Sequence, residues 1–312
     1  MMTAPEMTTT APRLGAHDAG IDTGALTRTR LAHPEQIAEA WAKRRRRHLG
    51  PGVDRLLLVA ADHPARGALG VRDEPMAMAS RHDLLHRLAT ALSRPGVDGV
   101  LGTPDILEDL LLLGLLEDKI VVGSMNRGGL AGAVFELDDR FTGYDAPALA
   151  QAGIDGGKML CRIALDDPGT ASTMVACAQA VSDLARHRLM AMVEPFWSRR
   201  DAAGRVGNLL DPDSVIRSIQ VASGLGTTSA YTWLKLPVVE DMPRVLDATT
   251  LPTLLLGGDP REDPDVVFGR WNDALMHPVA RGLVVGRTLL YPPDGRVADA
   301  VDVAASLVHP GK

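Results

Sequence analysis

Short runs of consecutive apolar residues recur along the chain, each followed by a segment in which apolar positions return every three or four residues. A short uninterrupted apolar run predicts a strand buried on both faces, as in a parallel sheet that helices cover on each side. The predicted strands cover residues 55–61, 99–102, 120–123, 157–163, 189–193, 231–236, 253–256 and 282–285.

The segments with helical spacing alternate with these strands. The predicted helices cover residues 81–93, 106–116, 146–152, 170–188, 211–223, 242–246, 265–275 and 297–308. Eight strand–helix units of uniform composition indicate an α/β protein, a single-domain (β/α)8 TIM barrel. An open, doubly wound sheet is the alternative, but no G-x-G-x-x-G motif follows the first strand.

The region ahead of the first strand adds an element to the barrel. Residues 34–49 predict an extra N-terminal helix that could cap one end of the barrel, and we expect its four arginines at positions 44–47 to lie on a solvated face. Residues 1–30, rich in Thr, Ala and Pro, predict a flexible tail, which leaves residues 31–312 as the barrel domain.

The charge, the apolar runs and the cysteine content of the chain limit its possible binding partners and its location in the cell. A formal charge of −6 spread over 312 residues argues against nucleic acid, and no apolar run is long enough for a signal peptide or membrane span. Only two cysteines are present, Cys161 and Cys177, so we expect reduced core thiols in a cytoplasmic protein. We also expect a homo-oligomer.

Lysine is rare, and its placement is informative. Of the five lysines, Lys158 and Lys235 lie within apolar runs that predict strands. A buried ammonium is costly unless it is paired or loses its proton. Lys235, between Leu234 and Leu236, is therefore either a paired strand-end lysine or a neutral amine that can attack a carbonyl and form a Schiff base.

Two acidic residues lie at the ends of predicted strands. In a (β/α)8 barrel the working side chains come from the carboxyl ends of the strands. Asp62 follows the first predicted strand and Glu194 the fifth, so with Lys158 and Lys235 they would share one cavity. In structural terms, Asp62 could instead cap a helix, and Glu194 could instead form an ion pair with Lys158. As catalytic groups, both carboxylates could carry protons.

A substrate-binding rim is predicted from the remaining strand ends. Asn126 and Arg127 follow the third strand. Gly257 and Gly258 follow the seventh, and Gly286 and Arg287 follow the eighth, where barrels commonly hold phosphate on backbone amides. Among nine histidines only His63 lies at a strand end, and no G-x-S-x-G motif is present. We therefore expect no metal site, no cofactor and no serine triad.

The chain resembles class I aldolases of the deoxyribose-phosphate and tagatose-bisphosphate aldolase superfamily, in a branch of actinobacterial sugar or inositol catabolism. The resemblance covers roughly residues 50–290, and residues 66–80 and 198–208 depart from it. Its carriers are the motifs AD at 61–62, GKML at 157–160, VEP at 193–195, WLKLPV at 233–238 and VGR at 285–287.

The resemblance implies a role for each matched residue. It makes Lys235 the Schiff-base lysine and Lys158 the residue that tunes the pocket and binds substrate oxygens. It makes Asp62 and Glu194 proton carriers. The expected activity is cleavage or formation of a carbon–carbon bond in a phosphorylated sugar: a deoxy-keto-gluconate phosphate, a ketose phosphate or bisphosphate, or deoxyribose 5-phosphate. A Schiff-base acyl transferase and a non-catalytic sugar-phosphate sensor are the alternatives.

Overall fold

The structure is a computed structural model, and it describes residues 20–47, 49–50, 54–258 and 261–311. Eight parallel strands in this part of the chain close into a barrel, because β1 pairs with both β2 and β9 and β4 pairs with β5. The strands of the ring are β1 (Leu56–Ala60), β2 (Gly99–Gly102), β3 (Ile120–Ser124), β4 (Gly156–Ile163), β5 (Met190–Arg200), β7 (Thr232–Leu236), β8 (Thr253–Leu256) and β9 (Ala280–Val285).

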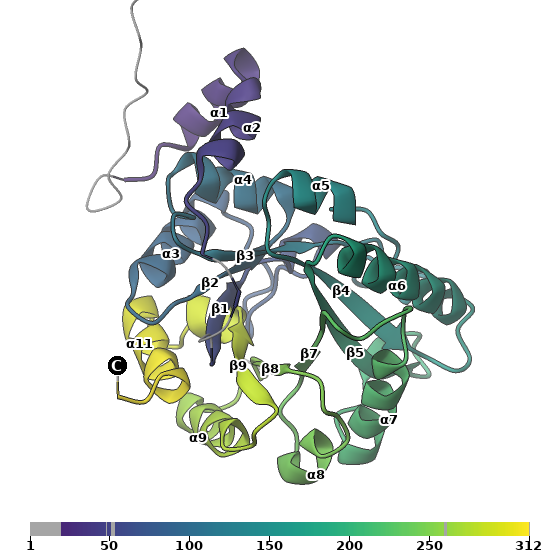
Figure 1. The fold of residues 1–312 in the computed structure, drawn as a ribbon. Helices are drawn as coiled ribbons and strands as arrows, with labels where there is room; N and C mark the ends of the chain where they lie inside the picture. Colours follow the sequence, from purple (N-terminus) through teal and green to yellow (C-terminus); the bar gives the residue numbers. More distant parts are fainter. Residues whose placement is uncertain (1–19, 48, 51–53, 259–260, 312) are drawn as a thin grey trace, which may run out of the picture.

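Helices surround this ring, as Figure 1 shows. Those that connect or cover the strands are α3 (Arg81–Ser93), α4 (Pro104–Leu112), α5 (Ala146–Gln151), α6 (Gly169–Arg186), α7 (Pro212–Ser223), α8 (Met242–Leu246), α9 (Pro264–Leu275), α10 (Arg287–Leu290) and α11 (Val297–Val308). The final helix, α11, packs against α3 and α9, so the two ends of the ring meet. The predicted (β/α)8 barrel in a single domain is confirmed.

Alternation along each strand divides the core into two layers. Side chains at every second position fill the barrel interior: Leu56, Leu58, Ala60, Leu101, Ile120, Val122, Met190, Met192, Leu254 and Val284. The intervening positions pack outward against the helices. Because strand side chains alternate between faces, the next inward position on β5 after Met192 is Glu194. The interior therefore changes from apolar to ionisable towards the carboxyl ends of the strands.

Two elements differ from the sequence-based expectation at the N-terminus. Helix α1 (Thr23–Ala32) is ordered, capped by Asp22, where a flexible tail to residue 30 was predicted. Residues 1–19 of that tail lie outside the described residues. The predicted helix over 34–49 ends earlier, as α2 (Glu35–Lys43), after which the chain becomes extended at Arg44 and Arg46 forms a bridge with Lys119.

The arginines after α2 do not lie on a solvated helix face, which corrects that prediction. The Arg44 side chain is completely buried and donates hydrogen bonds to the carbonyls of Lys119 (2.9 Å) and Gly153 (2.8 Å). Arg46 pairs with Asp155 at 3.1 Å, and Arg47 pairs with Asp98. Asp155 and Asp98 precede β4 and β2, so the arginines close the amino-terminal end of the barrel.

Replacing Arg44 with alanine is expected to lower the free energy of unfolding by about 3 kcal/mol, because buried carbonyls and Asp155 lose their cation. Arg45 provides a matched control, since its side chain is 59% exposed and pairs with Asp118 at the surface. Arg45→Ala is expected to change stability by less than about 1 kcal/mol. Urea denaturation of both variants measures the difference, and equal losses would contradict the assigned role of Arg44.

Candidate active site

The predicted catalytic residues meet at the carboxyl end of the barrel. Lys235 lies near the end of β7, Glu194 lies in the middle of the long strand β5, and Lys158 is the third residue of β4, in register with Met192 of β5. Asp62 lies two residues after Ala60, the last interior position of β1. All four are buried, with Asp62 and Lys158 having no exposed surface. Side chains from three strands, and from the segment directly after a fourth, thus form one charged cluster.

Glu194 connects the two lysines. Its Oε1 atom lies 3.0 Å from Lys235 Nζ, and its Oε2 atom forms an ion pair with Lys158 Nζ. One carboxylate therefore contacts both amines, with a separate oxygen for each. A carboxylate in contact with a buried amine is placed to give and take the protons of that amine.

Asp62 is held by a different set of donors. Its Oδ2 atom accepts hydrogen bonds from Lys158 Nζ and from the Ser124 hydroxyl, each at 3.2 Å, and forms an ion pair with Arg127 Nη2. Arg127 Nε also donates to Ser124 Oγ at 3.2 Å. Three donors thus converge on one oxygen and fix the orientation of the Asp62 carboxylate.

Burial dominates the electrostatics of the site. It lowers the pKa of Lys235 from its ordinary value, assisted by Arg127 and Arg287 and opposed by Glu194. Burial and the Arg127 charge also lower the pKa of Lys158 well below its ordinary value. For Glu194, burial favours the protonated form, but Lys158, Lys235 and Arg127 outweigh it and hold its pKa well below the usual range.

Access distinguishes the two amines. Lys158 lies between the carboxylates of Asp62 and Glu194, and its side chain has no exposed surface. The Lys235 side chain is 4% exposed and has Glu194 as its paired carboxylate. An amine enclosed between two acids cannot receive a carbonyl carbon without losing those partners. The geometry therefore favours Lys235 as the nucleophile and Lys158 as the residue that orders the acids.

The two polar residues predicted after the third strand, Asn126 and Arg127, form contacts within the protein. The Asn126 side chain donates to the carbonyls of Asp139 (3.1 Å) and Leu160 (2.7 Å) and accepts from the Leu160 amide (2.7 Å). Both of its N–H donors are used within the protein, where they link the segment after β3 to β4, and the predicted contact with substrate stays a prediction. Arg127 is 7% exposed and turns towards Asp62.

The predicted anion-binding residues lie on adjacent strand ends. Gly257 follows β8, and a Cβ atom there would come within 2.9 Å of Val285 Cγ1 in β9. Gly286 follows β9, where a Cβ atom would lie 2.6 Å from the Ala60 carbonyl, so only glycine permits this approach to β1. Arg287 Nη1 donates to the Gly70 carbonyl at 3.2 Å. Gly258, next to Gly257, completes this rim.

A second charged group, which the sequence did not indicate, extends the site outward. Strands β4 and β5 stay paired as far as Ile163 and Trp197, and β5 then turns back into β6 (Val206–Asn208). Near the end of β4, Arg162 binds both oxygens of Asp139, with Nε at 2.8 Å and Nη2 at 2.7 Å. Arg162 could have been found from the sequence, because every second side chain of a strand faces the same side and Arg162 lies four residues after Lys158.

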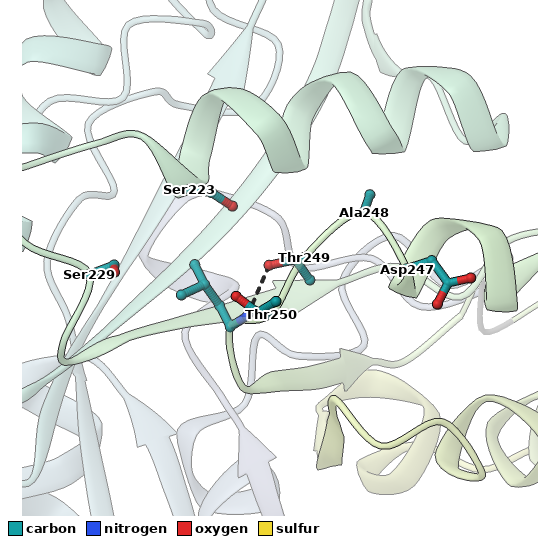
Figure 2. A pocket seen from close by; sticks show the side chains of 7 residues that line it. Ser223, Ser229, Asp247, Ala248, Thr249 and Thr250 are labelled. Atoms are coloured by element: carbon teal, nitrogen blue, oxygen red, sulfur yellow. Dashed lines mark hydrogen bonds between the residues drawn. The ribbon is translucent and has the colours of Figure 1, made fainter.

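A pocket of about 330 Å³ lies elsewhere on the molecule. Figure 2 shows its lining between the end of α7 and the turn before β8, where Thr249 Oγ1 accepts a hydrogen bond from the Leu251 amide at 3.0 Å. Ser229 and Leu251 precede β7 and β8, so this pocket opens at the amino-terminal ends of the strands, opposite to Lys235. It plays no part in the candidate active site.

Fold and site together define a (β/α)8 barrel with a pair of buried lysines at its carboxyl end. The chain belongs to the Cgl0159-like family, whose profile matches residues 54–305. The crystal structure of Cgl0159 from Corynebacterium glutamicum (Brevibacterium flavum) is 58% identical, with a TM-score of 0.89 over 92% of this chain and 96% of that one.

More distant structures share the fold. An archaeal fructose 1,6-bisphosphate aldolase is 16% identical, with a TM-score of 0.61 over 87% of this chain and 98% of that one. A structure of an archaeal fructose-1,6-bisphosphate aldolase with its catalytic lysine bound to the carbinolamine intermediate is 17% identical, with a TM-score of 0.59 over 87% of this chain and 97% of that one. A search of curated proteins finds no match. These likenesses show the shared fold, and the predicted resemblance to class I aldolases and to their superfamily branch stays a prediction.

Two further expectations concern the surroundings of the protein. In the described part of the chain, no helix is both long and apolar enough to cross a membrane. Cys161 and Cys177 are both buried free thiols, as predicted. The cytoplasmic location and the homo-oligomer stay predictions.

Proposed function

We propose that this protein is a class I aldolase that cleaves or forms a carbon–carbon bond in a phosphorylated sugar. The observation that carries the proposal is the position of Lys235: a buried amine of lowered pKa, with its Nζ atom 3.0 Å from Glu194, inside a closed barrel. Such an amine has the environment that a Schiff-base nucleophile needs. The archaeal aldolase with a lysine-bound carbinolamine supports the same chemistry on the same fold.

The proposed reaction starts with attack of neutral Lys235 Nζ on the sugar carbonyl. Glu194 carries the proton of the attacking amine to the carbinolamine oxygen, and then delivers a second proton, taken up from solvent, so that this oxygen leaves as water and the iminium ion forms. The iminium then accepts the electron pair of the breaking carbon–carbon bond, which produces an enamine and an aldehyde. Protonation and hydrolysis of the enamine regenerate Lys235. Lys158 remains between Asp62 and Glu194 and fixes both carboxylates.

The substrate class follows from the rim and the resemblance. Gly257 and Gly258 after β8, and Gly286 and Arg287 after β9, support a phosphate group at these adjacent strand ends. A deoxy-keto-gluconate phosphate and a ketose phosphate or bisphosphate rank above deoxyribose 5-phosphate on the resemblance of the chain to its superfamily. No nucleic acid, membrane or cofactor takes part in this proposal.

A cleavage assay on these sugar phosphates tests the proposal. The expected result is an aldehyde product from at least one of them, detected by coupled reduction, and its loss in Lys235→Ala. A Schiff-base acyl transferase would consume substrate without releasing an aldehyde. A sensor would keep its ligand response, measured as a thermal shift, in Lys235→Ala. Either of these outcomes would replace the aldolase proposal.

A further inference from the structure

His63 carries a partly buried imidazole at the candidate active site to which the proposed reaction assigns no step. It directly follows Asp62 and precedes a short 3-10 helix, η1 (Pro64–Arg66), which holds the chain at the carboxyl end of β1. Its side chain is 22% exposed, more than that of Lys235 or Glu194. A Cβ atom on Gly286 would lie 3.2 Å from His63 Cε1, so the missing side chain at Gly286 makes room for the ring.

Two atoms of the Asp62–His63 pair are buried and unsatisfied. Asp62 Oδ1 and His63 Nδ1 have no hydrogen-bond partner among the described residues, and they lie 3.8 Å apart. A buried polar atom left unpaired destabilises the protein. Because the other oxygen, Oδ2, already accepts from Lys158 and Ser124, Oδ1 is the atom available to His63. A small rotation of the ring would bring the two atoms within hydrogen-bond distance.

The hydrogen bond would decide which ring nitrogen is basic. If Nδ1–H donates to Asp62 Oδ1, the lone pair of the imidazole is on Nε2, and the carboxylate stabilises the imidazolium that forms when Nε2 takes a proton. Burial and the charges of Arg287 and Lys235 hold the pKa of His63 well below its ordinary value. Both effects favour the uncharged imidazole, and the carboxylate of Asp62 is the group that would stabilise the cation when the ring takes a proton.

We propose that His63 is a catalytic residue, a general acid–base held by Asp62, that removes the proton of the substrate hydroxyl during carbon–carbon cleavage. The assignment rests on the proposed aldolase function. It divides the proton transfers between two groups: Glu194 serves the nitrogen of Lys235, which it contacts, and His63 serves the substrate carbon chain. Asp62 then acts as a positioning residue and not as the proton carrier that the resemblance implies.

The step balances with the groups present. In the iminium intermediate, His63 Nε2 takes the proton of the hydroxyl on the carbon that becomes the aldehyde. The O–H electrons form the new C=O bond, the carbon–carbon bond breaks, and its electron pair moves through the new enamine double bond to the nitrogen of Lys235. The imidazolium later gives the same proton to the enamine carbon, and water hydrolyses the resulting iminium.

Separate measurement of Schiff-base formation and cleavage tests this assignment. The variants are His63→Ala and His63→Gln, and the control is His86→Ala, an exposed histidine on α3. Borohydride trapping with a deoxy-keto-gluconate phosphate, fructose 1,6-bisphosphate and deoxyribose 5-phosphate reports the Lys235 adduct, and aldehyde release from the same sugars reports cleavage. We expect both His63 variants to form the adduct within about threefold of the wild-type rate and to cleave about 10²–10⁴-fold more slowly.

Added imidazole provides a readout that a purely structural role would not change. It is expected to restore part of the cleavage rate of His63→Ala and to leave His63→Gln, whose side chain fills the site, unaffected. Wild-type cleavage rates in the His63 variants, or loss of the Lys235 adduct in folded variants, would overturn the role of His63. Absence of any adduct in the wild-type protein would instead overturn the aldolase function itself, so the two failures are distinguishable.

Discussion

Replacement of Lys235 by arginine is expected to lower the rate of carbon–carbon cleavage by about 10⁴-fold or more, because the guanidinium keeps its proton at neutral pH and cannot form an imine. Arginine keeps a positive charge beside Glu194, so the ion pair and the fold are expected to survive. The variant therefore separates loss of the nucleophile from loss of the charge. Single-turnover kinetics on the sugar that the wild-type protein cleaves measure the effect.

Lys43→Arg is the matched control for this substitution. The Lys43 side chain lies on α2, is 76% exposed and pairs with Glu39 at 3.0 Å, far from the carboxyl end of the barrel. We expect its cleavage rate to stay within about twofold of wild type, as for surface changes remote from a site. Equal rates in Lys235→Arg and Lys43→Arg would show that the reaction does not pass through an imine on Lys235.

Replacement of Glu194 by glutamine is expected to change both the rate and its pH dependence. Loss of the proton carrier should lower the maximal rate by about 10²–10⁴-fold. Glu194 raises the pKa of Lys235 through its charge and its hydrogen bond, so its removal lowers that pKa further. Since the amine reacts only when deprotonated, the rate falls as the pH drops below its pKa, and the acid limb of the profile should move to lower pH.

The pH profile distinguishes this effect from simple damage to the site. Glu117→Gln serves as the control, because Glu117 pairs with Arg45 at the amino-terminal end of the barrel and is 37% exposed. Its profile should coincide with that of the wild-type protein. A Glu194→Gln variant whose acid limb stays in place, or moves to higher pH, would contradict the coupling between Glu194 and Lys235.

The barrel and the centre of its site were predictable because both depend on short-range rules. Apolar runs of strand length give the ring, and period-two alternation carries the interior face from Met192 to Glu194 and brings Lys235 inward on β7. The barrel rule then places residues from distant strands in one cavity. Asp62 and Lys158 follow from the same reasoning.

The incorrectly predicted features depend on contacts that connect distant parts of the chain. The predicted helix over residues 34–49 continues past Lys43, but the observed helix ends there, where Arg44 donates hydrogen bonds to the carbonyls of Lys119 and Gly153. The hydrogen bonds between the Asn126 side chain and the Leu160 backbone were not predicted either. No local pattern in the sequence specifies such partners.

The role of His63 shows the same limit within the site. Its position after Asp62 was visible in the sequence, but a strand end alone does not reveal that two buried atoms of these neighbours lie 3.8 Å apart without partners. That fact depends on Gly286, which follows the last strand of the ring and leaves space for the imidazole. The turn between β1 and η1 sets the distance between these two atoms.

The most direct measurement is reduction of the protein with borohydride in the presence of each sugar phosphate, followed by mass mapping of the modified peptide. The account predicts one stable adduct, on Lys235, that forms with the sugar the protein cleaves and is absent from Lys235→Arg. A stable adduct on Lys158, with Lys235 unmodified, would contradict the assignment of the two amines. Cleavage of a sugar without any trapped lysine would contradict the Schiff-base chemistry altogether.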